Sequence, residues 1–120
     1  INMDGTALYV GIVSVFAAQS FGIDLTLMDY LIMAGTTTLV SVGTAAVPSA
    51  SLFLMAAVMA TIGMTPDQIA VTVGFIFIID RPLDMLRTVV NIAGDLSVST
   101  AVANWEGEFD REIFDRPLKY

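Results

Sequence analysis

The sequence predicts an all-α membrane protein, and three observations support that prediction. Of the 120 residues, 56% are hydrophobic and only 14% are charged, with a mean hydropathy of +0.79, whereas soluble domains are about a quarter charged. No charged residue occurs in residues 5–23 or in residues 30–66. The last apolar stretch carries polar residues at helical spacing. A soluble α-bundle with an apolar core is the alternative, because short apolar runs do not separate a buried helix from a spanning one.

The charge balance and the missing residue types exclude several classes of function. The formal net charge of −7 and the lack of a basic patch argue against nucleic acid or anionic lipid as a partner. The chain has no cysteine and no histidine, which excludes disulfides, thiol nucleophiles, imidazole bases and the usual zinc or copper ligands. Oxygen donors are left for any cation, so a hard cation such as sodium is expected. Residues 1–5 do not resemble a secretory signal.

The first half of the chain predicts one helix followed by two shorter helical arms. The apolar run 7–21 is long enough for a helix of about 22 Å, and residues 22–24 end it. A second helix is expected to start near Thr26, with Asp29 in its first turn where a carboxylate suits the helix dipole, and to end near Val40. Residues 41–51 are small and include Gly43 and Pro48. The second arm is predicted over 52–62, and residues 63–66 turn the chain again.

The uncharged span 30–66 is too long to be a single membrane helix. It would measure about 55 Å, against a hydrocarbon core of about 30 Å, so it must fold back. The first arm offers about 15 helical residues, fewer than the ~20 of a full crossing. This favours a re-entrant hairpin with its tip at membrane depth. The alternative is an ordinary helix interface packed through small residues, and periodicity does not decide between the two.

The remaining sequence predicts a broken last helix and a polar tail. The helix runs from Gln68 toward Trp105 and is interrupted at residues 80–82, because Pro82 lacks an N–H and its ring crowds the preceding turn. Residues 106–120 are acidic with interspersed basic residues and predict a solvated tail. Because the tail carries both acidic and basic residues, the positive-inside rule is a weak guide to the orientation of the chain in the membrane.

One face of this last helix is predicted to be a solute or ion site. At about 100° per residue the polar positions fall within roughly a third of a turn. Each Asp or Arg at mid-membrane depth costs about 2.5–3.5 kcal/mol. An Arg fork pairs bidentately with a carboxylate, and an Asp one turn away suits an ammonium. The alternative is a structural i, i+3 ion pair on a buried face. The face comprises Asp80, Asp84, Arg87, Thr88, Asn91 and Asp95.

Three segments of the chain, in this order, resemble motifs of the dicarboxylate/amino acid:cation symporter family, the glutamate transporters. They are residues 2–6 (Asn-Met-Asp-Gly-Thr), residues 41–48 (Ser-Val-Gly-Thr-Ala-Ala-Val-Pro) and residues 80–95. The resemblance covers about residues 2–104. It implies sodium-coupled symport of glutamate or aspartate across the inner (plasma) membrane by a multi-pass homotrimer with a cytoplasmic C-terminal tail. It also implies a fragment. Residues 1–105 would be part of a transport domain, made of the second half of a broken helix (1–22), a re-entrant hairpin (25–63) and the last transmembrane helix (66–105). Residues 106–120 would be the tail.

The resemblance also implies roles for individual residues. Asp84 would hold the ammonium of the substrate and Arg87 its side-chain carboxylate. Val10 follows Ala-Leu-Tyr where animal members carry a glutamate linked to proton and potassium coupling, which implies a carrier that runs on sodium alone. The implied substrate residues are Thr6, Val47, Asp84, Arg87, Thr88 and Asn91. The implied sodium residues are Asn2, Asp4, Ser41, Val42, Thr44, Asn91 and Asp95, with backbone carbonyls acting at Ser41, Val42 and Thr44.

Three other functions are weighed against this one. Proton-coupled glutamate or C4-dicarboxylate symport would use the same fold, although members resembling dicarboxylate carriers lack an Asp at the position of Asp84. An intramembrane aspartyl protease would use paired Asp residues, but it requires Tyr-Asp and Gly-x-Gly-Asp. Here residues 29–30 read Asp-Tyr and residues 92–95 read Ile-Ala-Gly-Asp, so no enzyme is expected. An interaction-only membrane subunit would pair the charged face with a partner helix.

Overall fold

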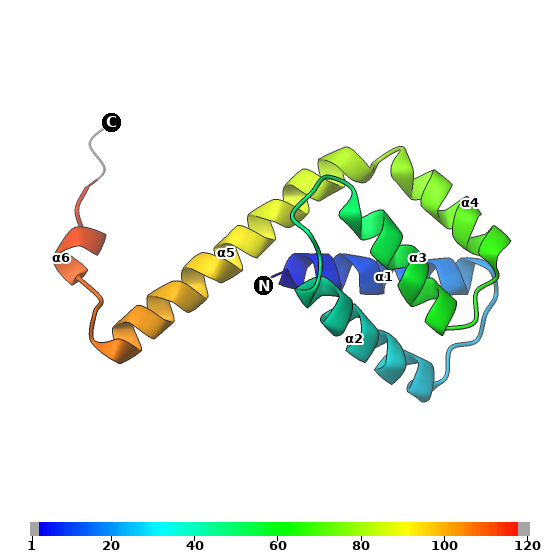
Figure 1. Cartoon of the computed structure of the whole chain (residues 1–120), viewed down its shortest axis with the longest axis horizontal. Helices are drawn as coiled ribbons and strands as arrows, with labels where there is room; N and C mark the ends of the chain where they lie inside the picture. The colour runs from blue at the N-terminus through cyan, green and yellow to red at the C-terminus, as the bar shows by residue number, and fades with distance from the viewer. Residues whose placement is uncertain (1–2, 118–120) are drawn as a thin grey trace.

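The computed structural model describes residues 3–117, and within that range the chain is entirely helical, with no strand (Figure 1). The predicted all-α class is therefore confirmed for this part of the chain. The helices are α1 (Asp4–Ser20), α2 (Leu27–Val42), α3 (Ala50–Thr61), α4 (Pro66–Phe77), α5 (Asp80–Glu106) and α6 (Arg111–Phe114).

Two helices begin at capping boxes. Thr26 caps α2, and its backbone N–H and hydroxyl donate to the Asp29 carboxylate at 2.8 and 2.7 Å. These two hydrogen bonds hold the pKa of the exposed Asp29 carboxyl below its usual range. Thr65 and Gln68 form the equivalent box at α4, where Pro66 occupies the first helical position, which needs no N–H.

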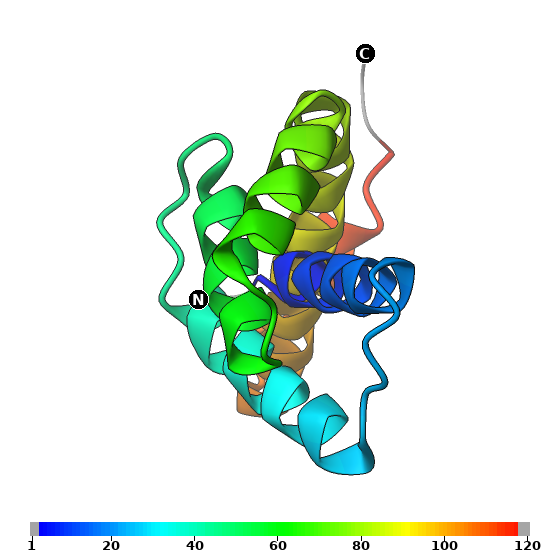
Figure 2. The ribbon, with the colours of Figure 1, turned by 90° about the vertical axis from the view of Figure 1, so that its right-hand side faces the viewer.

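Helix α1 lies at the centre of the packing. It contacts α2, α3 and α5, while α3 also contacts α2 and α4. Helices α2 and α3 run in opposite directions as the two arms of a hairpin, and Figure 2 shows both arms on one side of α1. Helix α5 crosses near the start of α1 and then extends past the other helices toward α6 and the C-terminus (Figure 1). The start of α1, the tip of the hairpin and the first half of α5 are thereby brought together.

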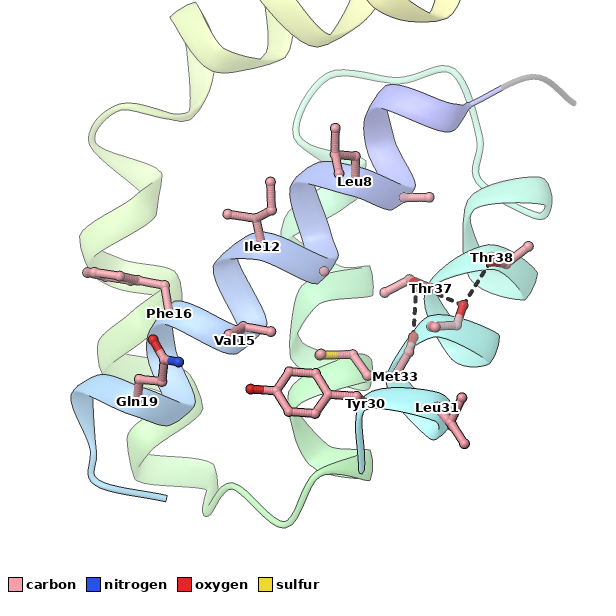
Figure 3. A pocket seen from close by; sticks show the side chains of 13 residues that line it. Leu8, Ile12, Val15, Phe16, Gln19, Tyr30, Leu31, Met33, Thr37 and Thr38 are labelled. Carbon is pink, nitrogen blue, oxygen red and sulfur yellow. Dashed lines mark hydrogen bonds between the residues drawn. The ribbon is translucent and has the colours of Figure 1, made fainter. Parts of the chain in front are cut away.

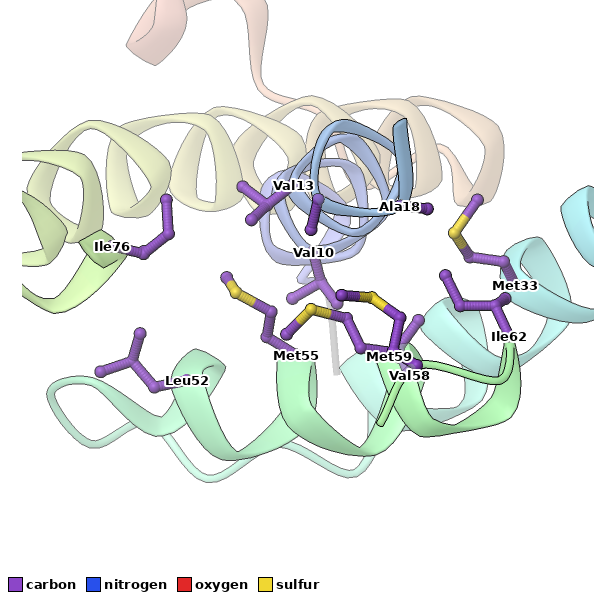
Figure 4. Close-up of a cluster of buried hydrophobic side chains, with 12 residues drawn as sticks. Val10, Val13, Ala18, Met33, Leu52, Met55, Val58, Met59, Ile62 and Ile76 are labelled. Carbon is purple, nitrogen blue, oxygen red and sulfur yellow. The ribbon is translucent and has the colours of Figure 1, made fainter. Parts of the chain in front are cut away.

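The apolar core joins α1 to the second arm of the hairpin (Figure 4). Met55, Val58 and Met59 of α3 are completely buried and pack with Val10 and Val13 of α1. Each fully buried side chain of this kind contributes about 1.5–3 kcal/mol. The core therefore fixes α1 against the hairpin. Its remaining members are Ala17, Ala18, Met33, Leu52, Ile62, Met64 and Ile76.

The hairpin tip is shorter than the sequence predicts. Helix α2 continues two residues beyond Val40, so Ser41 and Val42 are helical and the tip comprises residues 43–49. The Ser41 hydroxyl donates to the Thr38 carbonyl at 2.9 Å, and this local bond allows a small polar residue to stay in a helix. The second arm starts at Ala50 and not at residue 52.

The expected last helix over 66–105 is divided into α4 and α5, and the break lies at residues 78–79, just before the expected 80–82. Pro82 occupies the third position of α5, where the missing N–H costs no helical bond. Within residues 3–117, no helix combines the length and the apolar character that a membrane crossing needs. Gly107, with φ of +77°, ends α5, and the expected tail contains the short helix α6, capped by Asp110.

Candidate functional site

A cavity of about 280 Å³ lies where α1, the hairpin tip and α5 meet. Its size is close to the lower end of small-molecule sites, about 300–1,000 Å³. Helix α5 supplies its charged and amide side chains, and the tip supplies mostly small apolar ones. The lining residues are Met3, Thr6, Thr44, Ala45, Ala46, Val47, Pro48, Ala50, Ser51, Asp84, Arg87, Thr88 and Asn91.

Arg87 is the buried cation of this cavity. Its side chain is 5% exposed, and its Nη2 donates to Asp84 Oδ1. The guanidinium carbon lies 4.4 Å from the centre of the Tyr9 ring, a cation–π distance. Asp84 also lies 3.9 Å from Arg81, which is 62% exposed. Arg87 is thus held on two sides while its Nη1 is buried without a hydrogen-bond partner among the described residues.

Asn91 fastens the start of α1 to α5. The Gly5 N–H donates to Asn91 Oδ1 at 3.0 Å, and Asn91 Nδ2 donates to Thr6 Oγ1 at 3.3 Å. The first N–H groups of a helix have no partner within it, so the amide satisfies one of them. A Cβ added to Gly5 would lie 3.0 Å from Asn91 Oδ1 and 3.1 Å from the Arg87 carbonyl oxygen. Glycine is therefore needed for this close approach.

Unpartnered polar atoms gather beside the cavity. Buried polar groups normally find partners, so each one without a partner calls for an explanation. Arg87 Nη1 and Ser51 Oγ belong to cavity-lining residues, and Tyr9 Oη and Asp80 Oδ1 belong to residues on the adjoining helices. With Ser14 Oγ, these are the buried side-chain atoms without a partner within residues 3–117. A ligand in the cavity is one source of the missing partner for Arg87.

The six residues expected to bind substrate all line this cavity: Thr6, Val47, Asp84, Arg87, Thr88 and Asn91. They come from three segments that are up to 85 residues apart, as the contact between Thr6 and Asn91 illustrates. Thr6 and Arg87 are buried, whereas Val47 is 58% exposed at the hairpin tip.

The residues expected to bind sodium are more dispersed. Thr44 and Asn91 line the cavity, whereas Asp4 and Asp95 are exposed. Ser41 is buried in α2, its carbonyl accepts from the Thr44 N–H at 3.3 Å, and the neighbouring Val42 is exposed. Asn2 lies outside the described residues. Within residues 3–117 no three His, Cys, Asp or Glu side chains gather as a metal-binding group.

Sequence reasoning missed several residues of the site. Gly5 and Tyr9 touch Asn91 and Arg87, respectively, and small residues of the tip form one wall of the cavity. The sequence contained a signal for Tyr9, because it lies three residues after Thr6 and shares its helix face. Nothing local indicated that Asp80 and Ser49 would meet, since they are 31 residues apart.

A second and larger groove, of about 850 Å³, lies between α1 and α2 (Figure 3). Helix α1 contributes Leu8, Ile12 and Phe16, and α2 contributes Tyr30 and Leu31. Among the described residues that line it, none is charged. The smaller cavity is therefore the candidate site for a charged solute.

Comparison with known proteins identifies the family of the chain. Residues 1–105 match the sodium:dicarboxylate symporter family. The chain is 38% identical over 109 residues to the proton/sodium-glutamate symport protein of Bacillus subtilis (strain 168), covering 91% of this chain and 24% of that protein. It is 36% identical over 111 residues to the proton/glutamate-aspartate symporter of Escherichia coli (strain K12), covering 92% and 24%. It is 33% identical over 117 residues to the C4-dicarboxylate transport protein of Paracoccus denitrificans (strain Pd 1222), covering 98% and 25%.

The helices of residues 3–117 fit this family, and the relatives named above are transporters and not enzymes. The chain belongs to the sodium:dicarboxylate symporter family. It spans about a quarter of the length of the curated relatives it matches.

Proposed function

We propose that the chain is the C-terminal part of the transport domain of a sodium-coupled carrier for glutamate or aspartate, and that the 280 Å³ cavity is its substrate site. The full-length carrier is the longer protein that contains this chain. In this proposal Arg87 binds the side-chain carboxylate of the substrate, Asp84 binds its ammonium, and Thr6, Val47, Thr88 and Asn91 complete the site.

The buried guanidinium of Arg87 is the observation that carries the proposal. It combines a cavity-lining position, a side chain only 5% exposed and an Nη1 without a partner among the described residues. A planar fork with a spare donor suits a carboxylate ligand better than a Lys point charge would. Asp84 supplies the opposite charge one helical turn away, and an acidic amino acid needs both.

Charge balance supports coupling to a cation. Asp80 is fully buried, and neither ion pair of the described residues includes it. Asp80 and Asp84 carry two negative charges and Arg87 carries one positive charge, so the three groups have a net charge of −1. An acidic amino acid adds a further net charge of −1. Buried negative charge is costly unless a cation accompanies it, which favours co-binding of sodium. We assign the sodium ligands to Asn2, Asp4, Ser41, Val42, Thr44, Asn91 and Asp95, with carbonyl groups acting in the hairpin.

The exposed apolar surface supports a membrane setting. Leu27, Phe53 and Ile78 are 77–81% exposed, and soluble monomers rarely expose large contiguous apolar patches. We propose that α2 and α3 form a re-entrant hairpin within residues 25–63, that α1 belongs to a broken helix ending near residue 22, and that residues 66–105 form the broken last helix. The full-length carrier would be a homotrimer in the inner (plasma) membrane, with residues 106–120 as a cytoplasmic tail.

Proton-coupled symport of glutamate or a C4-dicarboxylate is the second candidate. The names of the relatives support it, since one is a proton/glutamate-aspartate symporter and another a C4-dicarboxylate transport protein. Asp84 favours an amino acid over a dicarboxylate, because a dicarboxylate brings no ammonium to offset its charge. An interaction-only membrane subunit would instead use Arg87 and Asp84 as a structural pair, and the unpartnered Arg87 Nη1 argues against it.

Uptake by the full-length carrier in proteoliposomes separates these candidates. Aspartate uptake is measured with an inward sodium gradient, with an inward proton gradient and with neither, and succinate is used as the matched substrate without an ammonium. The proposal predicts aspartate uptake driven by sodium and little uptake of succinate. Uptake driven only by protons would favour the second candidate, and no uptake under any gradient would favour the interaction-only subunit.

A further inference from the structure

Ser49 has an unusual backbone conformation at the end of the hairpin tip. Its φ is +61°, and within residues 3–117 it is the only residue other than glycine with a positive φ. A residue with a Cβ adopts this region at a cost. Ser49 also stands at the N-cap of α3 but makes no side-chain capping bond, although serine usually caps a helix at this position. Something other than local preference therefore holds Ser49 in place.

The contact that holds it is a hydrogen bond to α5. Ser49 Oγ donates to Asp80 Oδ2 at 2.7 Å. Asp80 is 0% exposed, and its Oδ1 has no partner within the described residues. Hydrogen bonds to ionised groups are shorter and stronger than neutral ones. The Ser49 hydroxyl thus solvates a buried carboxylate for which the described residues provide no basic partner.

In the part of the chain that the structure describes, the hydrogen bonds of the tip otherwise stay within the hairpin, whereas this one reaches α5. The Thr44 hydroxyl and the Gly43 and Thr44 N–H groups donate back into α2. The Val47 and Ala50 N–H groups donate within the tip. Residues 44–48 form one wall of the cavity and residues 84–91 of α5 form the opposite wall. Ser49 directly follows the first wall and Asp80 lies one helical turn before the second, so this hydrogen bond joins the two segments that form the walls.

We propose that Ser49 and Asp80 form a latch that holds the hairpin tip closed over the cavity. Ser49 is a positioning residue in this proposal, since it acts through the tip and does not line the cavity itself. Breaking the latch frees the tip to move away from α5, because its other hydrogen bonds stay within the hairpin. The role of the latch in substrate entry rests on the proposed function, whereas the closed tip does not.

The test measures how often the tip opens. This chain has no cysteine, so Ala46→Cys in a full-length carrier otherwise free of cysteine places one thiol at the tip. The rate of maleimide labelling is measured without substrate. Loss of the latch predicts about tenfold faster labelling in Ser49→Ala, which corresponds to ~1.4 kcal/mol. Ser51→Ala is the matched control, because Ser51 is buried beside the same cavity and its hydroxyl has no partner among the described residues.

Two further variants separate the hydrogen bond from the backbone. Ser49→Gly removes the hydroxyl but suits the positive φ, so a latch predicts faster labelling, whereas a purely backbone effect predicts slower labelling. In an Asp80→Ala background, Ser49→Ala is expected to give no further acceleration. The proposed latch would be contradicted if Ser49→Ala and the carrier with Ser49 intact were labelled at equal rates. It would also be contradicted if Ser51→Ala accelerated labelling as much as Ser49→Ala does. If Asp80→Ala does not fold, the comparison of Ser49→Ala with Ser51→Ala decides alone.

Protection by substrate distinguishes the latch from the proposed function. Aspartate with sodium is expected to slow labelling in the carrier with an intact latch. If it does not, while Ser49→Ala still labels tenfold faster without substrate, the proposed substrate is wrong and the latch stands.

Discussion

Replacing Arg87 with Cys is expected to abolish high-affinity binding of acidic amino acids. The change removes the buried guanidinium that lines the cavity, together with its hydrogen bond to Asp84 and its contact with the Tyr9 ring. Among residues 3–117, the basic partner that Asp84 then keeps is Arg81, at 3.9 Å and 62% exposed. An exposed ion pair of this kind contributes at most about 1 kcal/mol. The cavity becomes more negative and repels a second carboxylate.

The structure sets the size of the effect. Because the Arg87 side chain is only 5% exposed, its charge is weakly screened, and losing one member of a buried charge pair costs about 2–5 kcal/mol. At 1.4 kcal/mol per factor of ten, aspartate binding is expected to weaken by roughly 30-fold to several thousand-fold. Neutral amino acids, which bring no side-chain carboxylate, are expected to lose less or to gain.

Equilibrium binding to the purified full-length carrier tests this, with aspartate and serine titrated at one sodium concentration. Arg81→Cys is the matched control, since it removes the same kind of charge from the same helix but from an exposed position. A strong loss for aspartate in Arg87→Cys with little change in Arg81→Cys is expected. Unchanged aspartate affinity in Arg87→Cys would refute the assignment, and equal losses in both variants would point to a general charge effect.

Three further predictions concern the ion site, the helix contact and the coupling. Asp95→Asn is expected to weaken sodium binding and, through linkage, aspartate binding at fixed sodium; a sodium titration identical to that of the unchanged carrier would exclude Asp95 as a ligand. Gly5→Ala is expected to lower the stability of the full-length carrier by about 1–3 kcal/mol, because the added Cβ would lie 3.0 Å from Asn91 Oδ1. Thermal unfolding measures this, and Gly35→Ala is the control because its Cβ would meet nothing within 4 Å. Equal shifts of the unfolding temperature in both variants would contradict the prediction. Because Val10 has no titratable group, internal potassium is expected to leave aspartate uptake into vesicles unchanged when it replaces choline, and a several-fold stimulation would show that the coupling lies elsewhere.

Local chemistry predicted much of the fold. A helix was expected to start near Thr26 with Asp29 in its first turn, and α2 begins at Leu27. The last helix was expected to run from Gln68, and α4 begins two residues earlier, at Pro66. The helical spacing of the polar residues on α5 anticipated a shared face, and four of them line one cavity. Both features depend on residues within two or three turns of each other, which is the range that sequence periodicity reports.

Contacts between distant segments were beyond sequence reasoning. The end of α2 and the break before α5 differ from expectation by about two residues, because small residues and Pro82 tolerate more than one boundary. The bond between Gly5 and Asn91 joins residues 86 positions apart, and the left-handed Ser49 is explained by its bond to Asp80. Such features follow from how the helices pack and not from any local pattern.

The position of bound substrate in the full-length carrier shows whether Asp84 and Arg87 bind it. A cryo-electron microscopy structure of the full-length carrier with aspartate and sodium is expected to show density between Asp84 and Arg87, with the side-chain carboxylate at Arg87 and the ammonium at Asp84. A second map, of the carrier with sodium but without aspartate, is the control and should lack that density. If aspartate is bound at another site, and Asp84 and Arg87 remain paired with each other in both maps, the 280 Å³ cavity is not the substrate site.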